Sequence, residues 1–170
     1  QTKSMSQRKL QLLVFTSGMS VMAVEMTGLR LLAPFFGTSL VVTTILIGSM
    51  MGFLSLGYYL GGRFGDKHPN LPALGKVVAT SSALVLIIPL IAQPILRACS
   101  AILRPLIEGQ EISEPLVAIG TIGGGIVGTI FLFALPVTLM GTVSPWAIRL
   151  AVDNVENTGK AAGRLYALSA

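Results

Sequence analysis

Residues 116–140 read LVAIGTIGGGIVGTIFLFALPVTLM, a stretch without a single charged side chain. A transmembrane helix needs about 20 consecutive apolar residues to cross the hydrocarbon core of a bilayer. The stretch is longer than that, and three further apolar runs occupy residues 10–36, 39–60 and 74–96. The sequence therefore predicts an all-α, polytopic transmembrane bundle with four spanning helices. A fifth segment, residues 161–170, has the pattern of the start of another helix.

The composition of the whole chain supports a membrane location. The chain has 170 residues, of which 52% are hydrophobic and 11% are charged, and its mean hydropathy is +0.78. Soluble domains carry about 25% charged residues, so this chain cannot cover a soluble surface with polar groups. A soluble enzyme, a nucleic-acid-binding domain and a disordered tail are excluded as classes. The lipid bilayer is the expected partner, and we expect no nucleic acid.

The distribution of Lys and Arg predicts the orientation, because these residues accumulate in cytoplasmic segments. Nine of the twelve occur in the N-terminal tail, in the 61–76 connection and after residue 140, as Lys3, Arg8, Lys9, Arg63, Lys67, Lys76, Arg149, Lys160 and Arg164. The 97–115 connection has only Arg97 and Arg104 and is expected outside. We therefore predict a cytoplasmic tail over residues 1–9 and a membrane domain over 10–152. Residues 153–170 would form a cytoplasmic linker and the start of the further helix. The expected location is the cell membrane (inner or plasma membrane), as a multi-pass protein.

Two short motifs are expected at the cytoplasmic side. Gly62, Arg63, Asp66 and Lys67 predict a tight loop after the second span, in which Asp66 either caps the next segment or pairs with Arg63. A second motif contains Ser144, Pro145, Trp146 and Arg149. Trp and Arg are typical of membrane interfaces, and proline is favoured at the first position of a helix. Residues 144–152 are therefore predicted to form a separate interfacial helix.

Glycines spaced four residues apart predict close helix packing, because small residues let helix backbones approach in lipid. The second predicted span has two such pairs and the fourth has a ridge of three, namely Gly48, Gly52, Gly57, Gly61, Gly120, Gly124 and Gly128. Two interpretations remain open for these residues. They pack helices within the chain, or they form a docking face for another subunit.

Glu25 and Arg30 are charged residues inside the first predicted span. A carboxylate at the bilayer centre costs about 2.5–3.5 kcal/mol on insertion scales, so such residues are usually functional or paired. Five residues turn a helix by about 140°, so the two side chains do not share a face. Glu25 is therefore either part of a structural ion pair with another helix or a cation or proton site. Arg30 either has a partner on another helix or extends toward the membrane interface.

No pattern in the chain predicts catalysis, a bound cofactor or a metal site. No nucleophile–base set or paired carboxylate in a polar cleft occurs, and His68 is the only histidine. Gly123, Gly125 and Gly128 match the dinucleotide fingerprint, but that motif needs a preceding strand and a helix start. Here the glycines lie within a long apolar run. We expect the chain as given not to be an enzyme and to hold no cofactor.

Three groups of residues form a recognisable set of motifs: Ser17–Gly18, Glu25, Arg30–Pro34, Phe36–Gly37 and Ser39; Leu56–Tyr58, Gly61–Arg63 and Asp66–Lys67; and Leu135–Pro136, Gly141, Ser144–Pro145, Ile148–Arg149, Gly159 and Gly163–Ala167. Together these motifs resemble those of spermidine synthase-like membrane proteins, in which a major-facilitator-like membrane part is fused to a polyamine aminopropyltransferase domain. The segment from Gly62 to Lys67 is also similar to the loop between helices two and three of major facilitator transporters.

The resemblance implies an N-terminal membrane portion that anchors or assists a polyamine-related synthase. No residue of this chain corresponds to the aminopropyltransferase domain. Two alternatives remain open: an accessory or structural subunit of a larger membrane complex, and a fragment of a major-facilitator-type transporter. The expected partners are other membrane subunits or a C-terminal domain of the same protein.

Overall fold

The fold is an antiparallel bundle of long helices. The computed structural model describes residues 7–67, 70–108 and 114–151, together with residues 163 and 167. Four helices account for nearly all of these residues: α1 (Gln7–Phe36), α2 (Leu40–Lys67), α3 (Leu71–Glu108) and α4 (Glu114–Ala151). No strand occurs within the described ranges. The predicted all-α fold is therefore confirmed.

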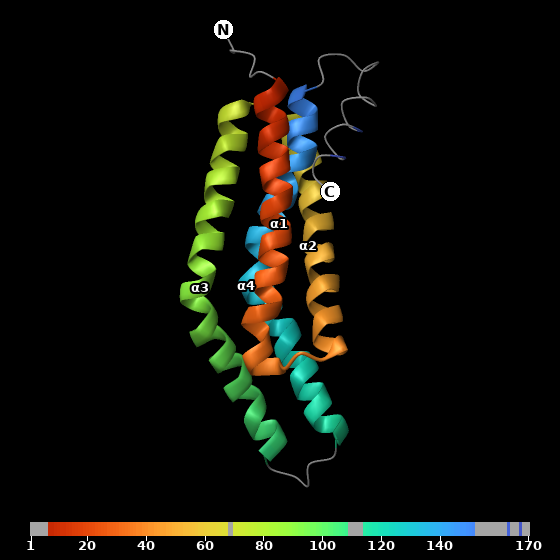
Figure 1. Cartoon of the computed structure of the whole chain (residues 1–170), viewed down its shortest axis with the longest axis vertical. Helices are drawn as coiled ribbons and strands as arrows, with labels where there is room; N and C mark the ends of the chain where they lie inside the picture. The colour runs from red at the N-terminus through yellow and green to blue at the C-terminus, as the bar shows by residue number, and fades with distance from the viewer. Residues whose placement is uncertain (1–6, 68–69, 109–113, 152–162, 164–166, 168–170) are drawn as a thin grey trace.

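Each of the four helices is long and apolar enough to cross a membrane, over Leu10–Phe36, Leu40–Lys67, Leu71–Ala101 and Ile122–Leu150. The chain is a multi-pass membrane protein. In an 18-residue window of the α4 span 56% of the residues are buried, against 17%, 22% and 17% in such windows of the other three. α4 is thus the central helix, and α1, α2 and α3 surround it (Figure 1).

The connection between α1 and α2 follows from local sequence chemistry. Gly37 has a φ of +80°, in the left-handed region where a residue without a Cβ is favoured. Its N–H donates to the Ala33 carbonyl at 2.9 Å and closes the last turn of α1. The Ser39 hydroxyl then accepts the Val42 N–H at 3.3 Å, as an N-cap residue does. The chain therefore reverses direction within three residues.

The helices extend beyond the predicted spans. α2 continues to Lys67 rather than ending near residue 60, and α3 runs from Leu71 to Glu108 rather than over 74–96. α4 has 38 residues, so it is about 57 Å long, whereas the hydrocarbon core is about 30 Å thick. Hydropathy marks only the part of a helix that lies in lipid, so it does not signal the turns beyond.

The predicted interfacial helix over residues 144–152 is wrong, because residues 144–151 are the last turns of α4, with Pro145 inside the helix. The local reason is packing: Trp146 is buried against Leu74 and Val143, and this contact keeps the segment in the bundle. The predicted linker over 153–170, including the start of a fifth helix, lies outside the described residues apart from Gly163 and Ala167. Most of the predicted tail, residues 1–6, lies outside them as well.

Candidate functional site

The two charged residues of α1 remain without a partner in the part of the chain that the structure describes. Glu25 is half-buried and Arg30 is exposed. Neither makes a hydrogen bond or an ion pair with any described residue, and the one ion pair among these residues lies elsewhere. The structure therefore does not bring Glu25 and Arg30 together, and both lie within a membrane span.

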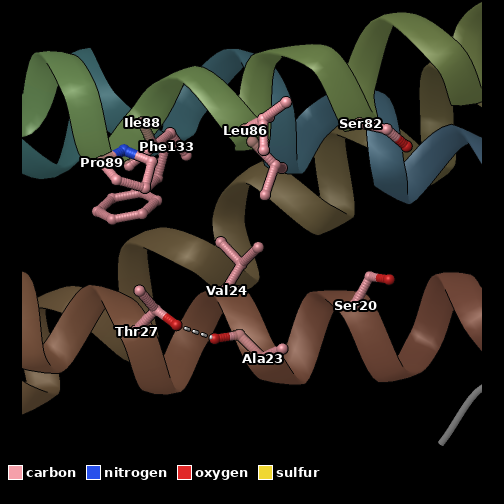
Figure 2. A pocket seen from close by; sticks show the side chains of 10 residues that line it. Ser20, Ala23, Val24, Thr27, Ser82, Leu86, Ile88, Pro89 and Phe133 are labelled. Carbon is pink, nitrogen blue, oxygen red and sulfur yellow. Dashed lines mark hydrogen bonds between the residues drawn. The ribbon is translucent and has the colours of Figure 1, made fainter.

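A groove runs between α1 and α3, with α4 as its floor. It consists of two adjoining cavities of about 380 and 390 Å³, which share Ser20, Ser82 and Val85. In Figure 2, Ser20 and Thr27 on α1 lie across the groove from Ser82 and Pro89 on α3. Pro89 lacks the N–H that would complete its helical turn, and Figure 1 shows α3 bowed near its middle. The sequence did not reveal this groove, because its lining residues come from three helices that only the fold brings together.

Most hydroxyl groups around the groove are already satisfied within their own helix. Thr16 donates to the Leu12 carbonyl at 2.9 Å, and Ser20 donates to the Thr16 carbonyl at 2.7 Å. Thr27 donates to the Ala23 carbonyl at 2.7 Å, the bond drawn in Figure 2. The remaining lining is mainly aliphatic and aromatic. The groove is therefore suited chemically to an apolar chain, and Glu25 is not among its lining residues.

The predicted packing glycines fall into two groups. A Cβ on Gly57 would collide with the Thr138 carbonyl oxygen and lie 2.9 Å from Gly141 Cα. A Cβ on Gly61 would lie 2.6 Å from Thr142 Cα. Backbones can approach this closely only where no side chain intervenes. These two glycines therefore create the α2–α4 contact, which is the most extensive helix contact in the described bundle.

The other predicted glycines differ in their surroundings. Gly48 and Gly52 are exposed, and a Cβ on either would meet no atom within 4 Å. On α4, Gly120, Gly124 and Gly128 are buried. A Cβ on Gly128 would lie 2.8 Å from Leu96 Cδ2 of α3. The ridge on α4 thus faces the interior, and the pair on α2 faces outward.

The predicted loop motif is helical instead. Gly62, Arg63, Asp66 and Lys67 all belong to the last turns of α2. Among the described residues, Asp66 forms its ion pair with Arg149 of α4 rather than with Arg63, and its Oδ1 lies 3.0 Å from Arg149 Nε. Both side chains are more than half exposed, so this pair contributes only about 0–1 kcal/mol.

The Ser144–Arg149 motif also differs from its prediction as a membrane-interface feature. The side chain of Trp146 is 5% exposed, and its ring lies against Gly65 of α2. Ser144 is buried as well, and neither Ser144 Oγ nor Trp146 Nε1 has a hydrogen-bond partner among the described residues. Only Arg149 is exposed. Trp146 therefore holds the ends of α2, α3 and α4 together from within the bundle.

Four of the exposed basic side chains of the described residues gather where these three helix ends meet, whereas Arg30 and Arg97 lie farther along α1 and α3. We call this region the basic end and define it by Arg63, Lys67, Lys76 and Arg149. Figure 1 shows that the start of α1 lies at the same end of the bundle. His68 lies outside the described residues, and within them no group of three His, Cys, Asp or Glu side chains could hold a metal ion. Comparison of the chain with models of protein families, with curated proteins and with solved structures finds no match.

Proposed function

We propose that this chain is a non-catalytic membrane module that anchors or assists a polyamine-related synthase at its basic end. The supporting observation is the rigid junction between α2 and α4. Gly57 and Gly61 seat the backbone of α2 directly on α4, and Trp146 packs between their ends and α3. This junction fixes the position of Ala151, the last residue of α4, at the basic end.

The identity of the proposed partner rests on the sequence resemblance to spermidine synthase-like membrane proteins. A synthase attached after α4, or held as a separate chain, would lie beside the basic end. Its substrates would be cationic polyamines, and the positive charge of the basic end would repel them. We therefore assign the basic end to holding the protein partner rather than to binding polyamine.

Affinity purification from native membranes in a mild detergent tests this proposal. We expect a stoichiometric polypeptide with aminopropyltransferase activity to be recovered with the chain, either in the same polypeptide or as a second subunit. Mass spectrometry identifies it, and transfer of an aminopropyl group to a polyamine measures its activity. Recovery of the chain without any such activity would refute the synthase assignment. Recovery with other stoichiometric membrane subunits would favour an accessory role.

Two glycine variants connect this test to the junction. Gly61→Leu places a side chain against Thr142 Cα, whereas the Cβ of Gly62→Leu would meet no atom within 4 Å. We expect Gly61→Leu to lose the associated synthase activity and Gly62→Leu to retain it. Equal loss in both variants would mean that the junction does not position the partner.

The groove between α1 and α3 favours a second candidate function, a fragment of a transporter. Transporter sites lie near the bilayer midplane between helices, and Ser20, Val24 and Thr27 line the groove in the middle of the α1 span. Filling it with Ser20→Trp should abolish uptake of a labelled apolar solute, while Leu90→Trp on the exposed side of α3, outside the lining, should not. Unchanged uptake in both variants would count against this candidate.

A further inference from the structure

The outward side of α1 carries a regular series of large apolar side chains. Leu12, Phe15, Met19, Met22 and Met26 are each between 43% and 66% exposed. Their spacings are three, four, three and four residues, which is the spacing of positions a and d in a heptad repeat. We call these five residues the α1 seam. One face of any α-helix repeats every three or four residues, so the spacing alone does not distinguish a protein partner from lipid, and the flanking charges decide between them.

The two unpartnered charges flank the α1 seam. When Met26 occupies position a, Glu25 occupies position g and Arg30 the following position e. In a parallel pair of helices, a g residue of one helix meets the e residue five positions later in the other. Glu25 and Arg30 have this spacing. They lie about 140° apart around a single helix, so they can meet each other only across two copies of α1.

We propose that α1 is the interface of a homodimer, in which the α1 seams of two copies pack in parallel and Glu25 of each copy pairs with Arg30 of the other. Two copies inserted in the same orientation have parallel α1 helices around a twofold axis along the membrane normal. The arrangement gives each intramembrane charge an opposite charge, which such residues require. Methionine adapts to the facing surface because its side chain is flexible.

The opposite side of α1 is already occupied within the bundle. Val14, Val24 and Leu32 are buried, and Figure 1 shows α1 in front of α4 with no described helix covering its outer side. The next d positions along α1 are Leu29, which is half-buried, and Phe36, which is buried against the core. A heptad pattern drifts by about 20° per repeat on a straight helix. The two α1 helices therefore separate beyond Leu29.

Charge reversal tests the proposed pairing. Glu25→Arg places a second guanidinium opposite Arg30 of the other copy, and Arg30→Glu places two carboxylates opposite each other. We expect each variant alone to lose the homodimer on native mass spectrometry and in pull-downs with two different tags. When the two variants are expressed together, every facing pair is complementary, so the mixed dimer should be recovered. Absence of the mixed dimer, or unchanged homodimers of either variant, would overturn the proposal.

Cysteine cross-linking in native membranes provides a test that leaves both charges intact. Cys99 is the only cysteine of the chain, so Cys99→Ala gives a background for single cysteines. Met22→Cys lies in the α1 seam, whereas Thr27→Cys is exposed beside the groove. Disulfides form where Cα atoms lie within about 7 Å. We expect oxidation to convert Met22→Cys, but not Thr27→Cys, to a dimer of twice the protomer mass.

The remaining outcomes of the cross-linking experiment contradict the homodimer. Equal cross-linking of both variants would indicate random collision. No cross-linking of Met22→Cys would show that the α1 seam does not meet a second copy. Cross-linking of Met22→Cys to a different polypeptide would show that another membrane helix covers the α1 seam.

Discussion

Gly57 and Gly52 lie on the same helix, five residues apart, in opposite surroundings. A Cβ on Gly57 would collide with the Thr138 carbonyl of α4, whereas a Cβ on Gly52 would meet nothing within 4 Å. The collision is with backbone, which cannot rotate away as a side chain can. Accommodating even one methyl group at Gly57 therefore requires α2 to move away from α4.

We predict that Gly57→Ala destabilises the bundle by about 1–3 kcal/mol, the usual cost of overpacking. Gly52→Ala is the matched control. It should leave stability unchanged or raise it by up to about 1 kcal/mol, because alanine is the better helix former. Thermal unfolding of the purified protein in detergent measures both. Equal stability of the two variants would show that α2 and α4 do not pack through Gly57.

The same glycines show what a sequence can predict at this scale. The spacing of Gly48 and Gly52 is identical to that of Gly57 and Gly61, and both pairs predict close packing. Only Gly57 and Gly61 face α4. Which pair faces inward depends on the position of α4 around α2, and that position is a property of the folded bundle.

At the scale of helices and connections, the short turn between α1 and α2 depends on backbone conformation. Gly37 combines a φ of +80° with open space around the position of a Cβ. We therefore predict that Gly37→Ala costs about 1–2 kcal/mol of stability from left-handed strain alone. Gly75 also has open space around it but lies within α3 and has no positive φ, so Gly75→Ala should not destabilise.

Chemical denaturation of both variants measures this difference. A Gly37→Ala protein that is as stable as Gly75→Ala would show that the turn relaxes to a conformation that alanine tolerates. The comparison isolates the effect of backbone conformation on stability, because neither added methyl group would have an atom within 4 Å.

The existence of the four helices could be predicted because lipid imposes a minimum length of apolar sequence. Their ends could be predicted only where local chemistry is distinctive, as at Gly37 and Ser39. The end of α2 could not, because Gly61 and Gly65 resemble turn residues until α4 lies against them. Trp146 likewise resembles an interfacial anchor until its burial between helices is seen.

For the whole molecule, the candidate sites combine residues that are distant in the chain. The groove joins α1 with α3, and the basic end joins three helix ends. The sequence identifies Glu25 and Arg30 as charges that are costly in lipid. It does not predict their environment, because that depends on which groups the folded bundle places beside them. No described residue pairs with either. The sequence likewise does not single out the α1 seam, because its exposure depends on which side of α1 faces the bundle.

The proposed function depends on which end of the bundle faces the cytoplasm, because a cytosolic synthase can meet only that end. Single cysteines at Thr38 and Asn70 in a Cys99→Ala background report on opposite ends, since both residues are exposed and lie in the connections that flank α2. Labelling intact cells with a membrane-impermeant maleimide measures which cysteine is outside. We predict that Thr38→Cys is labelled and that Asn70→Cys is labelled only after the membrane is permeabilised. Labelling of Asn70→Cys in intact cells would place the basic end outside and contradict the proposed function.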